Sequence, residues 1–187
     1  MSNLSDFIST GQGGGGINEI EIKPNAMVMD STMSDVDAGT AFDIYDTYDF
    51  PSTGDGAIWF KFLFPDGFDN ARDVVFDLAY TLNGADPTKA VRLRAHIWPN
   101  DDGDIPVEAS PVVNLAEDII SDDTPPGVNI GVVSYKDLSN IKIDSSLLSS
   151  DTRIVSFKLM RETTSPNDTY TGTFQLMSVK VRQVEAP

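Results

Sequence analysis

Two apolar runs near the middle of the chain dominate its pattern of hydrophobic and polar positions. Residues 57–64 and 74–82 are rich in aromatic and β-branched residues, and a segment of Pro, Asp, Gly and Asn separates them. Such a pattern predicts a strand, a connection and a second strand. In the second run apolar residues alternate with other residues, and Asp77 and Thr81 share the more polar face. This alternation is typical of a half-buried strand.

The first run differs because both of its faces are nearly apolar. Trp59 and Leu63 lie on the face opposite the one that carries four large apolar residues, namely Ile58, Phe60, Phe62 and Phe64. Only Lys61 interrupts this second face, so something beyond a single sheet is expected to pack there. Trp98, on a later predicted strand, adds further apolar surface. We therefore predict that Trp59, Leu63 and Trp98 form a homo-oligomer interface, in a trimer rather than another assembly.

Shorter segments of alternating or apolar residues predict the remaining strands. They cover residues 17–22, 26–33, 90–98, 112–115, 128–132, 153–161 and 170–184. The apolar phase of the last strand changes near Leu176, which predicts a β-bulge. Residues 35–56 are expected to form an acidic loop, and residues 137–148 are the one place where helical turns are expected. Many short strands separated by turn residues predict an all-β, antiparallel, two-sheet sandwich of jelly-roll type.

Composition narrows the classes of partner. The chain has 187 residues, 13 Lys and Arg against 29 Asp and Glu, and a net charge of −16. Such a surface repels phosphate backbones and anionic bilayers, so neither nucleic acid nor a membrane is an expected partner. No signal peptide is recognised, and no apolar run approaches the roughly 18 residues of a membrane span. The absence of cysteine excludes disulfides and thiolate metal sites.

Candidate catalytic and metal-binding residues are few. His96 is the only histidine, stands beside Arg92 and Arg94, and belongs to no hydrolase or zinc-protease motif. An exposed or interface residue is the expected role for it, and we predict neither enzymatic activity nor a cofactor. One acidic segment could offer oxygens to calcium: Asn100, Asp101, Asp102, Asp104 and Glu108. Its order does not match a calcium-binding loop, and ordinary turn chemistry explains it equally well.

The N-terminal sixteen residues have a composition of their own. A small apolar group precedes a run of glycines, and together they make up the predicted attachment arm: Leu4, Phe7, Ile8, Gly13, Gly14, Gly15 and Gly16. Glycine lets a backbone approach a partner surface closely, at a cost in conformational entropy. We therefore predict an arm over residues 1–16 that docks on a partner, followed by one sandwich domain over residues 17–187.

A series of short motifs carries a family resemblance. They are Trp59-Phe-Lys-Phe-Leu-Phe-Pro-Asp-Gly-Phe-Asp69, the strand from Val74 to Tyr80, the strand from Val91 to Trp98 with its Asn-Asp-Asp-Gly loop, Phe157-Lys-Leu-Met-Arg161, and Asp168-Thr-Tyr-Thr-Gly172. Taken together, the chain resembles bacteriophage virion proteins with jelly-roll domains, which serve as head fibres, capsid decorations and tail appendages.

The resemblance implies a jelly-roll domain, commonly trimeric, that is made in the host cytoplasm and docks on the particle through an N-terminal segment. No catalytic residues carry over. The first hypothesis is a capsid decoration or short head fibre whose partners are other virion proteins of the capsid or tail. The alternative is a tail appendage that binds a host receptor or carbohydrate through its aromatic residues. An enzyme that acts on surface polysaccharide would need a pair of carboxylates in a groove, and spacing along a sequence cannot test that arrangement.

Overall fold

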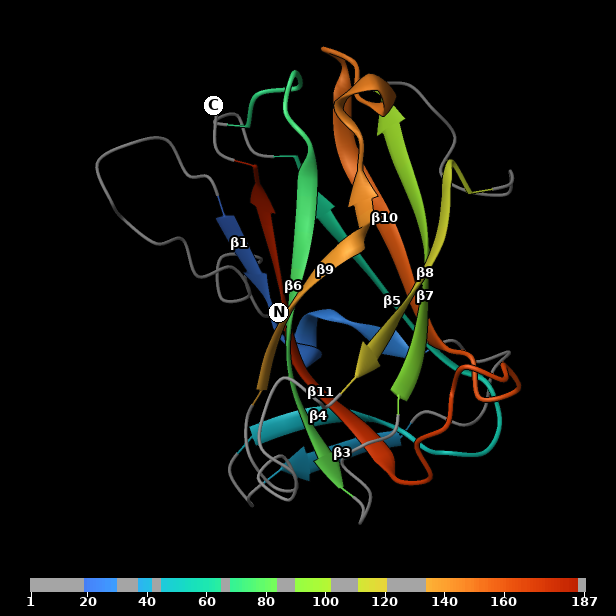
Figure 1. The fold of residues 1–187 in the computed structure, drawn as a ribbon. Helices are drawn as coiled ribbons and strands as arrows, with labels where there is room; N and C mark the ends of the chain where they lie inside the picture. The colour runs from blue at the N-terminus through green and yellow to red at the C-terminus, as the bar shows by residue number, and fades with distance from the viewer. Residues whose placement is uncertain are drawn as a thin grey trace.

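Two antiparallel β-sheets face each other in the computed structural model, which describes residues 19–29, 37–41, 45–64, 68–83, 90–101, 111–120 and 134–184 (Figure 1). The six-stranded sheet has the order β3 (Asp37–Ala41), β4 (Tyr45–Phe50), β11 (Thr173–Gln183), β6 (Val74–Asn83) and β9 (Ser134–Ile143), and β1 (Glu19–Ile22) also pairs with β11. The five-stranded sheet has the order β2 (Val28–Met29), β5 (Gly56–Leu63), β10 (Thr152–Arg161), β7 (Ala90–Asp101) and β8 (Val113–Ile120). The predicted fold class, an all-β antiparallel sandwich, is confirmed.

One local prediction was wrong and another was confirmed only in part. Residues 37–41 and 45–50 form β3 and β4, where an acidic loop was expected, and Phe50 of β4 is fully buried. Helical turns were expected within residues 137–148: a 3₁₀ turn forms at residues 145–147, but residues 137–143 belong to β9. The described helices are the 3₁₀ turns η2 (Pro24–Ala26) and η4 (Ser145–Leu147), and none of them is long enough to cross a membrane.

The pairing of β9 explains why its sequence looked irregular. Val75 of β6 lies opposite Lys142, but the next residue, Phe76, lies opposite Leu138, so the register shifts between them. A strand with such an irregularity loses its simple alternation, and periodicity then fails to detect it. The bulge predicted near Leu176 is confirmed. Leu176 pairs with Tyr80 and Ser178 pairs with Ala79, which leaves Met177 as the extra residue.

Aromatic contacts join the two sheets through the middle of the core. Phe157 of β10 stacks on Phe60 of β5, with ring centroids 4.6 Å apart. The ring of Phe76, from the six-stranded sheet, lies 4.6 Å from that of Phe157 and 6.5 Å from that of Phe62. Such pairs contribute about 0.5–1.5 kcal/mol beyond the burial of their area. The inward face of the central run at residues 57–64 therefore forms the centre of the core.

Two buried tyrosines allow a matched test of how much a hydrogen bond to a buried hydroxyl group contributes to stability. The Tyr48 hydroxyl donates a hydrogen bond to the carbonyl oxygen of Met27 at 2.9 Å, whereas the Tyr170 hydroxyl has no hydrogen-bond partner among the described residues. Tyr48→Phe should lower the free energy of unfolding by about 0.5–1.5 kcal/mol, and Tyr170→Phe should leave it unchanged or raise it. Urea unfolding followed by circular dichroism measures both. A larger loss for Tyr170→Phe than for Tyr48→Phe would contradict this account.

Candidate functional site

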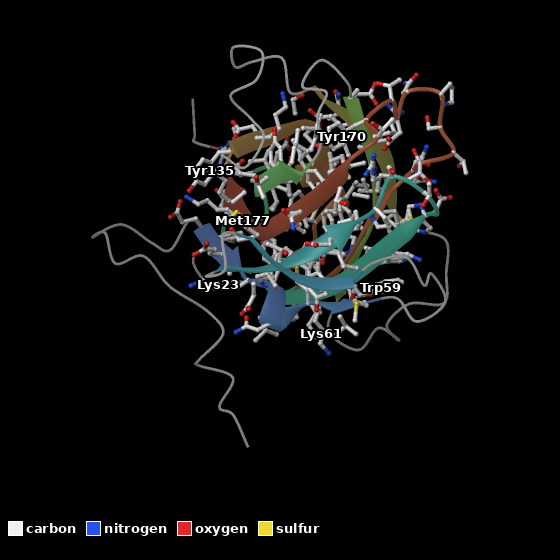
Figure 2. The ribbon with its side chains drawn as sticks, turned by 90° about the horizontal axis from the view of Figure 1, so that it is seen from below. Lys23, Trp59, Lys61, Tyr135, Tyr170 and Met177 are labelled. Carbon is white, nitrogen blue, oxygen red and sulfur yellow. The ribbon has the colours of Figure 1, made fainter. Side chains whose placement is uncertain are left out.

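The side of the five-stranded sheet that points away from the core, called the outer face below, carries an unusual set of side chains. Its described members come from all five strands and include Val28 of β2; Trp59, Lys61 and Leu63 of β5; Ile154, Ser156, Lys158 and Met160 of β10; Arg92, Arg94, His96 and Trp98 of β7; and Asn114, Ala116 and Asp118 of β8. Glu162, in the loop after β10, adjoins them through Arg94 and is counted with this face. Figure 2 shows Trp59 and Lys61 on the same side of the molecule. Strand alternation places these residues outside because their neighbours fill the core.

Two tryptophans stack on each other at the centre of the outer face. The rings of Trp59 and Trp98 are 5.2 Å apart between centroids and inclined by 22°. They come from β5 and β7, which flank β10, and neighbouring strands lie about 4.8 Å apart. Both rings must therefore lean over β10, and the small side chain of Ser156, which is paired with Trp98, leaves room for them. Trp98 is only 7% exposed and supports Trp59, which stays partly exposed.

Charged and polar groups adjoin this stack. Lys158 lies between Trp59 and His96 in the sheet, and its Nζ is 5.1 Å from the centroid of the Trp59 ring. That distance is within the range of a cation–π contact. The imidazole of His96 meets the Trp98 ring edge-on, with centroids 6.0 Å apart. One ammonium, one imidazole and two indoles thus form a continuous surface across three strands.

Next to His96, two arginines organise the polar half of the outer face. Arg94 donates from Nε to Glu162 Oε1 at 2.5 Å and from Nη1 to Asn114 Oδ1 at 2.7 Å. Arg92 donates from Nη1 to Asp118 Oδ1 at 2.6 Å. Hydrogen bonds between charged groups are the stronger kind, and a planar guanidinium fixes the direction of each partner. These contacts hold the carboxylates and the amide in fixed orientations on the surface.

The electrostatic environment of His96 reports the sign of the local charge. Burial lowers the pKa of His96 below its ordinary value, and the nearby charges of Lys158 and Arg94 lower it further. A hydrogen bond with Asn114 and the charge of Glu162 act in the opposite direction, but less strongly. Among the nearby charges, those of Lys158 and Arg94 act on the pKa of this imidazole more strongly than that of Glu162.

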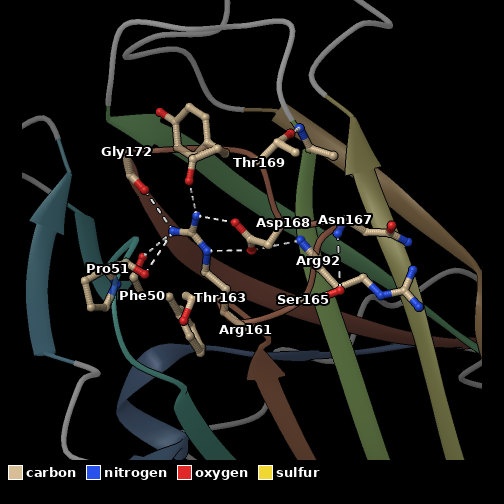
Figure 3. A network of polar contacts seen from close by, with 12 residues as sticks. Phe50, Pro51, Arg92, Arg161, Thr163, Ser165, Asn167, Asp168, Thr169 and Gly172 are labelled. Carbon is tan, nitrogen blue, oxygen red and sulfur yellow. Dashed lines mark hydrogen bonds and ion pairs between the residues drawn. The ribbon is translucent and has the colours of Figure 1, made fainter.

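A buried ion pair anchors the loop that supplies Glu162. Arg161 ends β10 in the inward phase of the strand, and its side chain is fully buried beside that of Asp168, which is 2% exposed. Arg161 donates from Nη2 and from Nε to the two carboxylate oxygens, at 2.8 and 2.9 Å (Figure 3). Asp168 also accepts a hydrogen bond from the backbone N–H of Arg92 at 3.0 Å. The pair thus fixes the loop against β7 at the border of the outer face.

The remaining donors of Arg161 bind backbone carbonyls from two parts of the chain. They are those of Phe50, Pro51, Tyr170 and Gly172. A buried guanidinium is tolerated only when its donors are satisfied and its charge is paired, and this site meets both conditions. The motifs at residues 157–161 and 168–172, which carried part of the family resemblance, are therefore joined by this single side chain. Its role is structural, because it is sealed from solvent.

The residues predicted to form the oligomer interface and the attachment arm do not all lie together in the structure. Trp59 and Trp98 are brought together, whereas Leu63 is 54% exposed farther along β5. Their predicted role in an oligomer interface stays a prediction. The arm residues at positions 1–16 lie outside the described residues, so the arm and the domain boundary after it also stay predictions.

The calcium hypothesis gains no support from its described members. Asn100 is nearly buried and donates from Nδ2 to the carbonyl oxygen of Trp98 at 3.0 Å, and Asp101 accepts a hydrogen bond from Thr152 Oγ1 at 2.9 Å. Asp102, Asp104 and Glu108 lie outside the described residues. Within the part of the chain that the structure describes, no group of three or more His, Cys, Asp or Glu side chains could hold a metal ion.

Three important members of the outer face were not singled out from the sequence: Lys158, Glu162 and Asn114. They come from β10, the following loop and β8, and only the strand order brings them beside Trp59, Arg94 and His96. Nothing local marks them. Arg161 did carry a signal, because an arginine in the inward phase of a regular strand requires a buried acidic partner.

Comparison with known proteins identifies the fold and nothing narrower. No family model matches the chain, and no curated protein sequence matches it.

Among solved structures, a xylan-binding module, CBM15, is 13% identical, with 92% of this chain and 100% of that chain covered and a TM-score of 0.55. TmCBM61, solved with β-1,4-galactotriose, is 10% identical over 84% of this chain and 87% of its own, with a TM-score of 0.41. Tailspike protein 4 of bacteriophage CBA120 is 8% identical, with 94% of this chain and 21% of that chain covered and a TM-score of 0.42. The likeness to the xylan-binding module shows a shared β-sandwich fold.

Proposed function

We propose that this chain is a glycan-binding domain whose outer face holds a polysaccharide through Trp59 and the polar groups around it. This proposal develops the second of the two hypotheses drawn from the sequence, a domain that binds a receptor or carbohydrate. The sequence analysis assigns Trp59 and Trp98 to an oligomer interface; the present proposal instead gives Trp59 a role in binding glycan.

The observation that carries the proposal is the tryptophan stack on a polar surface. Sugar rings have apolar C–H faces and polar edges, so their binding sites need a flat apolar ring beside fixed donors and acceptors. Trp59 offers such a ring, and Trp98 supports it from below. Arg94 of β7, Asn114 of β8 and Glu162 of the loop after β10 lie near the stack, and the hydrogen bonds of Arg94 hold the other two in place. Preorganised groups of this kind lose little conformational entropy on binding.

Binding without catalysis is the form of this function that we propose. A glycosidase of the usual kind needs two carboxyl groups, one of them kept as a proton donor. The described carboxylates of the outer face, Asp118 and Glu162, are instead engaged by Arg92 and Arg94 at 2.6 and 2.5 Å. Both carboxylates are therefore already committed to contacts with arginines of this face. No cofactor is required by the proposal.

Affinity electrophoresis of the full chain tests the proposal. Gels containing xylan, mannan, mixed-linkage β-glucan, polygalacturonate or alginate should retard the protein in at least one case. Xylan is included because the fold is shared with a module described as xylan-binding. The control is Trp59→Ala, which should migrate as it does in a gel without polysaccharide. If no polysaccharide retards the protein, or if the variant is retarded equally, the proposal fails.

The setting on a phage particle is a separate part of the proposal and rests on the sequence resemblance alone. In that setting the arm at residues 1–16 attaches the chain to other virion proteins and the sandwich presents the outer face. Light scattering of the purified protein tests the trimer directly. A trimer that excludes glycan from Trp59 would favour the interface role of this residue over the binding role.

A further inference from the structure

The charged side chains of the outer face run against the overall charge of the chain. The chain carries a net charge of −16. On the described outer face, however, four cations meet two carboxylates: Lys61, Arg92, Arg94 and Lys158 against Asp118 and Glu162. Each of these two carboxylates is engaged by an arginine. The described charges of the outer face therefore have the opposite sign to the net charge of the chain.

The lysines stand where a ligand on Trp59 would meet them. The Nζ of Lys158 is 5.1 Å from the centroid of the Trp59 ring. Lys61 follows Trp59 by two residues on the same strand and the same side, at a spacing of about 6.6–6.8 Å, and it is exposed. The ammonium group of Lys158 therefore lies over the Trp59 ring, where a bound sugar unit would meet it, and that of Lys61 would be near the next unit. Arg94 holds Glu162 and Asn114 through Nε and Nη1.

We infer that the outer face selects an anionic polysaccharide whose sugar units carry carboxylate groups. The inference rests on the proposed function and adds the class of glycan to it. In this arrangement Trp59 contacts the face of a uronate unit, Lys158 binds the carboxylate of that unit, and Lys61 binds the carboxylate of a neighbouring one. Because the whole chain repels polyanions, attraction comes only from this local set of charges.

The unique histidine provides a readout of the ligand charge that is independent of affinity. Burial is the main cause that lowers the pKa of His96 in the free protein; the charges of Lys158 and Arg94 lower it further, and that of Glu162 raises it less strongly. A carboxylate bound at Lys158 would offset the positive charge, so the pKa of His96 should rise when the ligand is anionic. A neutral glycan supplies no such charge. His96 is the only histidine of the chain, so its imidazole signals in a nuclear magnetic resonance titration are assigned without ambiguity.

The experiment uses the full chain and two oligosaccharides that differ only in charge, an oligogalacturonate and its methyl ester. It is accompanied by a panel of polygalacturonate, alginate and hyaluronan against neutral xylan, mannan and β-glucan, with poly(dT) as a nucleic acid. We expect anionic polymers alone to bind, and Lys158→Gln to weaken that binding by about tenfold. Lys180→Gln removes the same charge from the six-stranded sheet, where Lys180 pairs with Glu19 at 3.4 Å, and should change binding by less than about twofold.

The other outcomes would contradict the inference, and they differ in whether the proposed function also fails. Binding of neutral glycans alone, lost in Trp59→Ala, would overturn the inference and leave the proposed function standing. Tighter binding of poly(dT) than of any polyuronate would show that the face recognises nucleic acid. Equal losses for Lys158→Gln and Lys180→Gln, or an unchanged His96 pKa with bound polyuronate, would also overturn it. If nothing binds, the inference and the proposed function fall together.

Discussion

Replacement of Arg161 by alanine should lower the free energy of unfolding by about 3–5 kcal/mol, a large part of the stability of a domain of this size. The substitution leaves the carboxylate of Asp168 buried without its cation, since the side chain of Asp168 is only 2% exposed. It also removes the donors to the backbone carbonyls of Phe50, Pro51, Tyr170 and Gly172. Chemical denaturation followed by circular dichroism measures the loss.

Two further variants separate the buried pair from a general loss of charge. Arg72→Ala removes an arginine whose Nε is 3.4 Å from Asp69 on the surface, and it should cost less than about 1 kcal/mol. Arg161→Lys keeps the positive charge but loses the planar fork, so its cost should lie between those of the two alanine variants. A cost for Arg161→Ala as small as that for Arg72→Ala would show that the ion pair is not needed to anchor the loop.

The second large effect is expected from Trp59→Ala, which should weaken glycan binding by about 30-fold or more, as for an aromatic residue at the centre of an interface. Trp59 is partly exposed, so its removal should leave the fold intact. Trp98 is a poorer choice, because it is nearly buried and its truncation should also destabilise the sandwich. Isothermal titration calorimetry with the polysaccharide that binds the intact protein gives the affinity ratio.

A matched control exists on the other sheet. Tyr135 of β9 is 80% exposed, and Tyr135→Ala removes an aromatic side chain from a surface to which no binding is assigned. This variant should bind as the intact protein does. If Trp59→Ala and Tyr135→Ala behave alike, the outer face is not the binding surface.

The strands that could be predicted from the sequence are those in which one face meets the core without interruption. In residues 155–161 each inward position is apolar until Arg161, and the alternation identifies the strand correctly. β9 escaped prediction because its register shifts opposite Val75 and Phe76, which breaks the period. β4 escaped because the polar residues at Asp46 and Asp49 resemble those of a loop, although its Phe50 is part of the core.

The candidate site was only partly predictable, for a reason of topology. The sequence pattern was enough to place Trp59 and Trp98 on the strand faces that point away from the core, where large apolar residues are unusual. Their stacking, however, depends on β10 lying between β5 and β7, and the sequence separation of these strands hides that order. The same order brings Lys158 beside Trp59. Sequence patterns reveal which face a residue occupies, whereas neighbours within a sheet follow from long-range pairing.

Tryptophan fluorescence tests the central claim most directly, because Trp59 and Trp98 are the only tryptophans of the chain and both belong to the outer face. All tryptophan emission therefore originates at the proposed site. Titration of the intact protein with the polysaccharide that retards it in electrophoresis should shift or quench the emission, and the change should saturate with the affinity measured by calorimetry. Binding that leaves the emission unchanged would place the ligand elsewhere and contradict the account.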